Sequence, residues 1–244
     1  NIFDDLENAE RRLSKSNLNQ SNSENVDEEE YSRFANLPMV KYEGKIHYYK
    51  DFYEVAEGFD ELLKKLTDEE VPVCFDLEWT FDYKSGPKPV AVMQICMDLD
   101  NCFVIQMSTL KKIPASLTAF LYHPKTILHG VNIKNDFRKL ARDFPCFKAD
   151  PLIEKCVELG EFYNKVFNST ERWSLSRLTG QTLKQQVDKS RHLRMSNWNF
   201  APLNETQLMY AAIDVFVSHH PLEHLISAKK QLIILSFLDR AENL

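Results

Sequence analysis

The segment VCFDLEW, residues 73–79, places two carboxylates at the end of an apolar run that is typical of a buried strand. Residues i and i+2 of a strand point to the same face, so Asp76 and Glu78 are expected to lie side by side. Two carboxylates at that spacing repel each other, and burying them without a partner is costly. A divalent cation would relieve both costs. The segment therefore predicts a metal site whose other ligands lie elsewhere in the chain.

Further acidic residues follow in segments that could carry them to the same place. Asp136 comes after the predicted strand TILHG (126–130), in the first turn of a predicted helix. Asp214 lies in another predicted helix, four residues after Tyr210, and residues i and i+4 share one helix face. About four carboxylates around two Mg²⁺ or Mn²⁺ ions are the ligand set of two-metal phosphodiester hydrolysis. A phenol beside one of these carboxylates is suited to orient an attacking water.

Each of these residues has a structural alternative when it is taken alone. Asp is common in the first turn of a helix, which would account for Asp136. Glu78 could pair with a lysine, and Tyr210 could be an aromatic side chain at the edge of the core. The order D-x-E, then N-x-x-x-D, then Y-x-x-x-D favours one shared site over three separate explanations.

The elements that must position these residues follow from the hydrophobic periodicity. Strands are predicted at 45–49, 71–78, 90–97, 102–107 and 126–130, and helices at 51–66, after Pro114, at 135–144 and at 203–218. Asp51 and Asn204 are N-cap candidates, and the segment KSGPKP (84–89) is predicted to be a loop. Strands in a meander, followed by strands that alternate with helices, indicate a mixed sheet flanked by helices.

Composition divides the chain into a tail and one domain. Residues 1–36 hold nine acidic and four basic residues, which is most of the chain's net charge of −6. Their polar composition predicts a disordered acidic tail, in which Ser21 is a candidate phosphorylation site. Residues 40–228 are expected to form a single domain, because no boundary signal interrupts them. Residues 229–244 are interpreted as a C-terminal extension.

Several classes of protein are disfavoured. Five cysteines without a C-x-x-C pair argue against a disulfide framework and a thiolate zinc site, so a reducing compartment is expected. No apolar run reaches the ~18 residues of a membrane span, so no membrane association is expected. Nucleic acid is not excluded, because the chain outside the acidic tail carries a net charge of only −1. His219, His220 and His224 are interpreted as a helix-surface cluster, since no cysteine is near and Pro221 lies between them.

Together, FDLEW, HGVNIKND and YAAID resemble the three motifs of the DEDD family of 3′–5′ exonucleases, in its tyrosine-type branch. The segments VAVMQIC (90–96), RWSLSRL (172–178) and KSRHLRMSNW (189–198) are similar to the Werner-like members of that family. The resemblance covers roughly residues 40–228. Because no helicase motifs follow, a stand-alone Werner-like exonuclease is expected.

The resemblance implies a ribonuclease H-like fold, in which a mixed central sheet is flanked by helices on both sides. It also implies roles by position for the candidate site residues. Asp76 would bridge two Mg²⁺ or Mn²⁺ ions, and Glu78 and Asp214 would hold the ion that activates water. Asp136 would hold the second ion, and Tyr210 would orient the nucleophile.

The implied activity is hydrolysis at the 3′ ends of DNA, with release of nucleoside monophosphates. Single-stranded, overhanging or recessed ends would be favoured over blunt duplex. The implied setting is the nucleus, in replication, recombination or repair, with a separately encoded RecQ-type helicase as a candidate partner. An RNase D-like enzyme that trims RNA is an alternative, because the motifs do not separate DNA from RNA. A nucleic-acid-binding module with a retired active site is a further alternative, which the intact acids and tyrosine disfavour.

Several side chains near the motifs are candidates for contact with nucleic acid. Trp79 and Phe137 directly follow candidate ligands and could stack on a base, although either could instead be a core residue. Gln94 resembles a glutamine that the family places near its substrate, and the alternative is a polar residue on a sheet face. The remaining candidates are Lys134, Lys189, Arg194 and Trp198. In the same basic clusters, Lys139 and Arg142 are interpreted as exposed on a solvated helix face.

Overall fold

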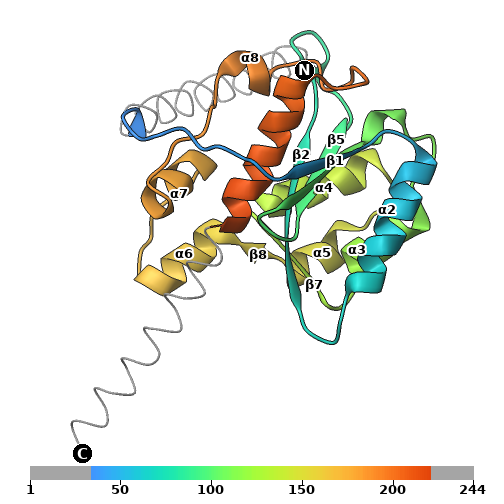
Figure 1. Ribbon diagram of the computed structural model, residues 1–244, viewed down its shortest axis with the longest axis horizontal. Coiled ribbons are helices and arrows are strands. Elements are labelled where there is room, and N and C mark those ends of the chain that lie inside the picture. Colours follow the sequence, from blue (N-terminus) through green and yellow to red (C-terminus); the bar gives the residue numbers. More distant parts are fainter. Residues whose placement is uncertain (1–33, 221–244) are drawn as a thin grey trace, which may run out of the picture.

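Strand β2 (Val71–Glu78) lies inside the sheet, and its alternating residues face the two helical layers of the fold. The computed structural model describes residues 34–220 (Figure 1). The other strands of the main sheet are β1 (Lys45–Tyr49), β5 (Val92–Cys96), β6 (Asn101–Gln106), β7 (Thr126–Gly130) and β8 (Val157–Glu158). Their order is β1-β6-β5-β2-β7-β8, with β5 antiparallel to both of its neighbours and the other pairs parallel. The predicted mixed sheet is confirmed.

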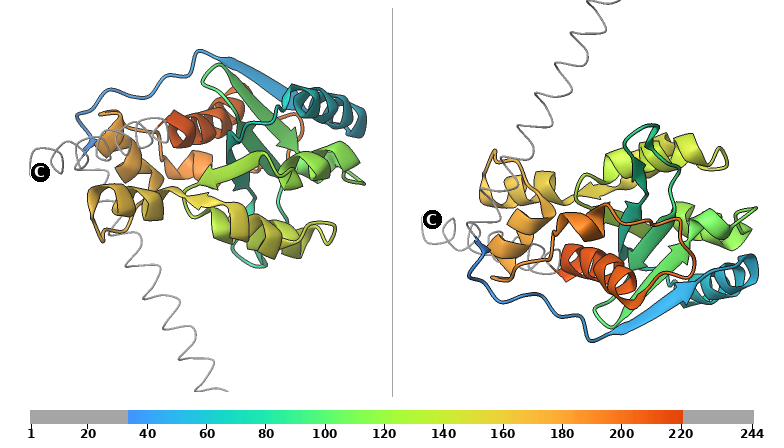
Figure 2. Two further views of the ribbon diagram at one scale, coloured as in Figure 1. Left: turned by 90° about the horizontal axis from the view of Figure 1, so that it is seen from below. Right: turned by 90° about the horizontal axis from the view of Figure 1, so that it is seen from above.

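One face of the sheet packs against a layer of helices (Figure 2). These are α2 (Phe52–Lys65), α3 (Ala115–Tyr122), α4 (Ile133–Asp143) and α5 (Ala149–Lys155), with the short 3₁₀ helix η1 (Met107–Thr109) after β6. Val73, Phe75 and Leu77 of β2 face this layer and belong to the largest hydrophobic core. The Asp51 carboxylate accepts hydrogen bonds from the first amides of α2, so the predicted cap is confirmed.

The opposite face packs against a helix that is described from residue 205 to residue 220. Asn204 Oδ1 accepts the Gln207 amide at 2.9 Å, and Gln207 Oε1 accepts the Asn204 amide at 3.2 Å. This reciprocal capping fixes where the helix begins, as the sequence predicts. Three further helices lie around it and were not predicted, namely α6 (Leu159–Phe167), α7 (Leu175–Thr182) and α8 (Arg191–Arg194) (Figure 1).

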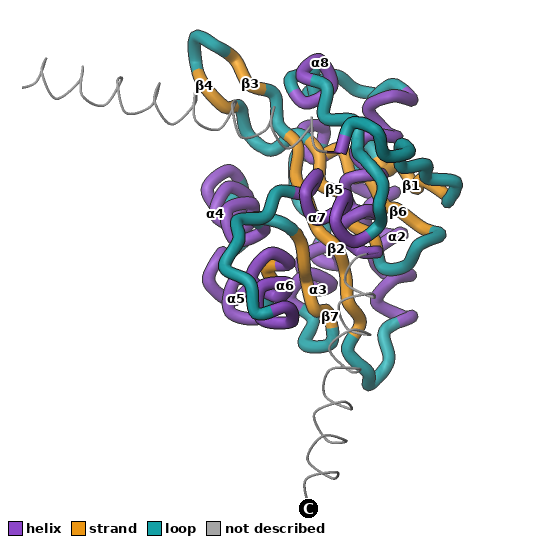
Figure 3. Tube along the Cα trace, turned by 90° about the vertical axis from the view of Figure 1, so that its left-hand side faces the viewer, coloured by secondary structure: helices purple, strands orange, loops and turns teal. Residues whose placement is uncertain are grey.

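The segment between β2 and β5 differs from the predicted loop. Strands β3 (Phe81–Asp82) and β4 (Gly86–Pro87) pair as a small hairpin that projects beyond the main sheet (Figure 3). The Asp82 carboxylate accepts the amides of Lys84 and Ser85, and Gly86 adopts a positive φ of 77°. An aspartate that accepts the amides of a turn and a glycine at a position of positive φ are both typical turn residues, so the sequence contained the information for this hairpin.

Several expectations lie wholly or mainly outside the described residues. These are the acidic tail with Ser21, the extension 229–244 and His224. Of the tail, residues 34–36 are described, and the Ala35 carbonyl accepts a hydrogen bond from Gln186. Contacts with the domain therefore begin before the predicted boundary at residue 36. Within residues 34–220, no helix has the length and apolarity needed to cross a bilayer.

Candidate active site

Asp76 and Glu78 lie on the same face of β2, as their spacing predicts. Asp76 stands opposite Gln94 of β5 in the antiparallel register, and Glu78 stands opposite Val92. This is the face that helix 205–220 covers, because Cys74 of β2 packs with residues of that helix. The strand therefore directs its apolar residues into the main core and its acids toward the helix.

Helix 205–220 presents Tyr210 and Asp214 to this face of the sheet. The two residues are 7% and 3% exposed, and their i, i+4 spacing places them on one side of the helix. Ala211 and Ala212 are fully buried on the same helix, and such small side chains allow its backbone to lie close to the strands. The buried Trp198 ring lies 5.8 Å from the Tyr210 ring, so packing fixes the position of the phenol.

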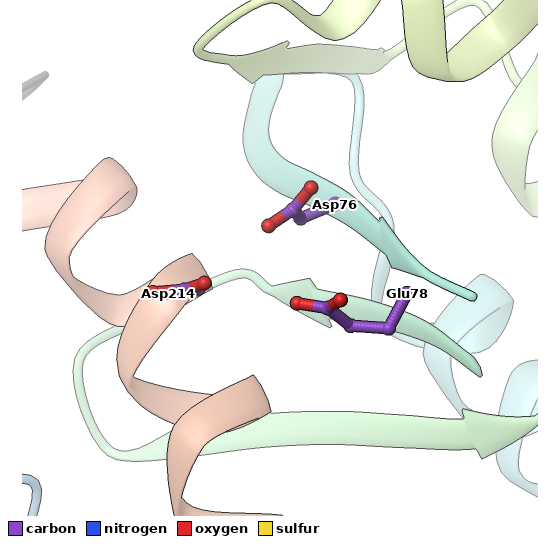
Figure 4. A group of neighbouring side chains, drawn as sticks. All are labelled: Asp76, Glu78 and Asp214. Atoms are coloured by element: carbon purple, nitrogen blue, oxygen red, sulfur yellow. The ribbon is translucent and has the colours of Figure 1, made fainter. Parts of the chain in front are cut away.

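The acids of strand and helix converge on one point. Asp76 and Glu78 extend from β2 toward Asp214 on the helix (Figure 4). One ligand atom of each residue lies within 4.8 Å of the other two. Like charges at this separation repel strongly where water is excluded, and an oxygen-rich group of this kind is suited to a hard divalent cation.

Asp136 lies beside this group rather than within it. It is 8% exposed on α4, and burial, followed by the charge of Asp76 and then that of Glu158, raises its pKa well above the usual range. Glu158, at the end of β8, was not predicted and is a fifth carboxylate on this side of the site. Its side chain accepts the Asn132 amide at 2.7 Å. A carboxylate directly before a helix that was not predicted belongs to no motif, so only the fold identifies it.

The electrostatics of the group disfavour its charged form. Burial, followed by the charge of Asp214, raises the pKa of Asp76 to about 7. Burial and the charges of Asp76 and Asp214 raise the pKa of Glu78 well above the usual range. Burial, followed by the neighbouring carboxylates, also raises the pKa of Tyr210, so this phenol stays protonated at neutral pH. Raised carboxyl pKa values are the expected result of several acids that share one buried site.

Lys189 contacts the group directly. Its Nζ donates to both carboxylate oxygens of Asp214, at 2.8 Å and 3.0 Å, and lies 5.2 Å from the centre of the Tyr210 ring. Lys189 was predicted to contact phosphate. In the structure it is instead the ion-pair partner of a candidate ligand, because the segment before α8 passes alongside helix 205–220.

The residues present fit a divalent metal ion. The donors are carboxylate oxygens, which Mg²⁺ and Mn²⁺ prefer. Beside them, neither amide atom of the fully buried Gln94 has a hydrogen-bond partner among residues 34–220. Cross-strand neighbours have Cβ atoms about 4.5–5.5 Å apart, so the Gln94 and Asp76 side chains leave the sheet side by side on the same face. A buried amide without a partner is costly, and a hydrated ion at Asp76 would supply one.

Three predicted nucleic-acid contacts are not supported. Gln94, Phe137 and Trp198 are all fully buried, so none of them exposes a surface on which a base or a phosphate could rest. Phe137 packs in the main core, with its ring 5.0 Å from that of Phe75. The Trp198 carbonyl and the Gln106 amide are joined by a 2.9 Å hydrogen bond beneath the active-site helix. These residues are therefore part of the packing around the site.

The other predicted contacts differ in their surroundings. Trp79 is half-buried against the main core, and Lys139 Nζ lies 4.8 Å from the centre of its ring. Lys139 is only 6% exposed, so its predicted solvation is wrong, whereas Arg142 is exposed as predicted. Lys134 is partly exposed and pairs with Glu161 at 2.7 Å, and Arg194 is exposed at the end of α8.

The histidines of helix 205–220 do not form the predicted surface cluster. His219 is 2% exposed, and its ring lies 5.1 Å from that of the fully buried His129 of β7. Burial, followed by the proximity of His219, lowers the pKa of His129 to about 3. This pair of buried, tilted imidazoles is part of the packing between helix and sheet, on the side of the core that includes Cys74.

Comparison with known proteins agrees with this geometry. Residues 52–228 match the family model described as 3′–5′ exonuclease. A protein of Drosophila yakuba named 3′-5′ exonuclease is 53% identical over 184 residues, which is 74% of this chain and 52% of that protein. Its Drosophila melanogaster counterpart is 52% identical over the same shares of the two chains. The chain thus spans about half the length of the curated relatives it matches.

Solved structures with the same fold include the Nibbler EXO domain of Aedes aegypti, with a TM-score of 0.64 and 16% identity. The match covers 77% of this chain and 89% of that domain. Escherichia coli RNase D matches with a TM-score of 0.61 and 15% identity over 77% of this chain and 46% of that one. A Brucella melitensis NrnC structure with bound Mg²⁺ has a TM-score of 0.56 and 19% identity, over 77% of this chain and 83% of that one. The expected ribonuclease H-like fold is confirmed.

Proposed function

Because this chain belongs to the 3′–5′ exonuclease family, we propose that it hydrolyses phosphodiester bonds at the 3′ ends of DNA and releases nucleoside monophosphates. The observation that carries the proposal is the convergence of Asp76, Glu78 and Asp214, whose ligand atoms lie within 4.8 Å of one another. A site that only bound nucleic acid would direct cations at the phosphates, not a group of converging acids. Converging carboxylates are instead what metal-assisted hydrolysis requires.

Asp76, Glu78 and Asp214 would hold one Mg²⁺ or Mn²⁺ ion, and Asp136 would hold a second together with Asp76. Asp76 is suited to be the shared ligand, because its charge acts on Glu78 and on Asp136 alike. When the ions are bound, they supply charge stabilisation for the phosphate and lower the pKa of the attacking water. The carboxylates would hold these ions in a site partly shielded from solvent, where electrostatic interactions are stronger than in water.

Tyr210 acts as a hydrogen-bonding group and not as a base in this proposal. Its raised pKa keeps the phenol protonated at neutral pH, so the hydroxyl can orient the nucleophile but does not take its proton. Tyr210→Phe keeps the ring against Trp198 and leaves the carboxylates in place. Its effect on the rate is therefore expected to be smaller than that of losing a ligand.

We propose DNA as the substrate because the segment 189–198 resembles the Werner-like exonucleases, and we place the activity in the nucleus for the same reason. Single-stranded, overhanging or recessed 3′ ends would be preferred over blunt duplex. RNA is the second candidate, because E. coli RNase D, described as an exoribonuclease of structured RNA processing, shares the fold. DNA and RNA differ at the 2′ position of the sugar, and we assign none of the described residues to recognition of a 2′-hydroxyl.

The test is a cleavage assay on one sequence prepared as DNA and as RNA, each labelled at the 5′ or the 3′ end. With Mg²⁺ or Mn²⁺, we expect 5′-labelled DNA to give a ladder that shortens with time. The 3′-labelled strand should release labelled mononucleotide from the start. Faster cleavage of RNA would assign the chain to the exoribonucleases, and no cleavage of either strand would reject the nuclease proposal.

Asp76→Asn is the control that ties the activity to this site. The rate should fall by orders of magnitude, since the ions supply several kcal/mol and ~1.4 kcal/mol is a factor of ten. The metal-free melting temperature should stay level or rise, because the raised pKa of Asp76 shows that its charge is unfavourable in the fold. A variant that cleaves normally, or that loses several kcal/mol of metal-free stability, would make Asp76 a structural residue.

A further inference from the structure

The β3–β4 hairpin leaves the main sheet directly after the candidate ligand Glu78. It forms a two-stranded sheet of its own and projects from the body of the protein (Figure 3). We refer to residues 79–88 as the hairpin arm. Its turn is held by hydrogen bonds from the Lys84 and Ser85 amides to the Asp82 carboxylate. The turn at the tip is therefore held by hydrogen bonds within the arm itself.

The base of the arm is fixed to the helix that carries Asp136. Lys139 Nζ of α4 donates to the Lys88 carbonyl at 2.8 Å and to the Asp143 carboxylate at 2.7 Å. The same ammonium group lies 4.8 Å from the centre of the Trp79 ring. Both ends of the arm are thus held by one buried lysine, which explains why α4 contains a charge in its buried face.

The side of the arm is braced by the segment 191–199. Arg191 Nη2 donates to the Tyr83 hydroxyl at 3.1 Å. Thr80 Oγ1 donates to Asn197 Oδ1 at 3.3 Å and accepts the Asn199 amide at 3.3 Å. The arm therefore has a fixed direction relative to both sides of the active site.

The arm nevertheless exposes an aromatic side chain at its tip. Tyr83 is 75% exposed, and Lys84 beside it is exposed as well. An exposed aromatic ring contributes no packing energy to the core. An exposed aromatic side chain next to a lysine is suited to bind a ligand that has both flat apolar faces and negative charge. Bases and phosphates of a nucleic-acid strand present these features together.

The length of the arm is compatible with contact to a strand near its 3′ end. Tyr83 follows Glu78 by five residues, which span at most about 17 Å of extended chain. Stacked nucleotides advance by about 3.4 Å each, so this distance corresponds to about five nucleotides. A strand whose 3′ end lies at the carboxylates would have its next few nucleotides within reach of the tip.

We propose that the hairpin arm is a second nucleic-acid contact, in which Tyr83 stacks on a base and Lys84 pairs with a phosphate within the first few nucleotides of the strand being degraded. This inference rests on the proposed nuclease function, because that function defines where the 3′ end lies. It makes the arm a determinant of substrate length, since a dinucleotide would be too short to engage the tip.

The test measures binding of fluorescent single-stranded DNA to the Asp76→Asn protein, so that cleavage does not interfere. Adding Tyr83→Ala should weaken binding of a 12-mer about 5- to 160-fold, which corresponds to the ~1–3 kcal/mol of one lost base–aromatic stack. The loss should be much smaller for a dinucleotide, and smaller for Tyr83→Phe, which keeps the ring. Lys84→Ala should lower the slope of log K against log salt by about 0.7.

Tyr53→Ala is the matched control, because Tyr53 is 77% exposed on α2 and belongs neither to the carboxylate group nor to the hairpin arm. It should bind both oligonucleotides as the parent does. Unchanged 12-mer binding by Tyr83→Ala, or an equal loss for both lengths, would overturn the role of the arm. A wild-type protein that cleaves no nucleic acid would instead reject the proposed function, and the binding series would still report on the arm.

Discussion

The ammonium group of Lys189 lies 2.8 Å from Asp214 Oδ1, so a lysine occupies the position of a counter-ion beside a proposed metal ligand. The charge of Lys189 also lowers the pKa of Asp76 and Glu78, although burial and neighbouring acids outweigh it. The Lys189 side chain is 20% exposed, whereas that of Asp214 is 5% exposed. Lys189 can therefore turn toward solvent while Asp214 stays in place, and a divalent cation would compete with it for the carboxylate.

Lys189→Met is expected to have opposite effects on stability and on metal binding. The metal-free protein should lose ~1–3 kcal/mol of unfolding free energy, because Asp214 is left buried and unpaired. Affinity for Mn²⁺ should rise about two- to tenfold, the equivalent of ~0.4–1.4 kcal/mol, since no ion pair has to break. Thermal melting and calorimetric titration with Mn²⁺ measure the two effects.

Lys134→Met is the matched control, since Lys134 pairs with Glu161 at 2.7 Å outside the carboxylate group. It should change stability by less than ~1 kcal/mol and leave Mn²⁺ affinity unaltered. If Lys189→Met instead lowered the Mn²⁺ affinity, Lys189 would position Asp214 for the metal and the competition would be rejected.

The parts of the site that the sequence predicts are those defined by short-range periodicity. Asp76 and Glu78 share a face because a strand repeats every two residues, and Tyr210 and Asp214 share a face because a helix repeats every 3.6. The Asn204 cap follows from the same local chemistry. These features need no knowledge of which elements pack together, so they could be predicted from the sequence.

The residues that were misinterpreted are those whose environment depends on distant segments. Whether Lys139 points to solvent depends on the Lys88 carbonyl, 51 residues away in the chain. Whether Lys189 meets a phosphate or Asp214 depends on how the segment before α8 crosses helix 205–220. Phe137 and Trp198 are apolar residues beside motifs, and only the layering of the fold shows that both are buried.

Gln94→Met tests the unpartnered amide beside Asp76. Methionine has a similar volume without the polar atoms, so metal-free stability should stay level or rise by ~1 kcal/mol. Affinity for Mn²⁺ should fall several-fold, because the amide no longer supports the hydrated ion. Melting curves without metal and Mn²⁺ titrations together give the result.

Gln106→Met provides the comparison for this substitution. Gln106 is equally buried, but its Nε2 donates to Ser108 Oγ at 2.8 Å and to the Trp198 carbonyl at 2.9 Å. This variant should be destabilised by ~1–3 kcal/mol, since it leaves buried partners without hydrogen bonds. Equal destabilisation by Gln94→Met would show that the Gln94 amide already has a partner and has no role toward the metal.

The raised carboxyl pKa values predict how metal binding depends on pH. The pKa of Asp76 is about 7 in the fold against an ordinary value of 3.8, so the folded protein gains this proton before the unfolded chain does. Its contribution therefore raises metal-free stability as pH falls from 8 toward 5. Mn²⁺ must displace the proton, so its affinity should fall by up to ~tenfold per pH unit below 7.

Titrations at pH 6, 7 and 8 in two buffers would measure both the Mn²⁺ affinity and the number of protons released. A Mn²⁺ affinity that does not change over this range would contradict the prediction.

The buried pair of His129 and His219 predicts a separate acid sensitivity with the opposite sign. The pKa of His129 is lowered to about 3 from its ordinary 6.5, so the unfolded chain takes up this proton first. Stability should fall as pH drops below 6.5, by about 2 kcal/mol between pH 7 and pH 5 from this residue. His129→Leu should remove that loss, whereas His192→Leu, at an exposed position of α8, should retain it.

Urea unfolding of wild type and the two variants at pH 7 and pH 5, with metal removed by a chelator, measures the free energy of unfolding of each protein. Equal losses in wild type and His129→Leu would show that His129 is protonated in the fold, and the packing of the two rings would then need a different explanation.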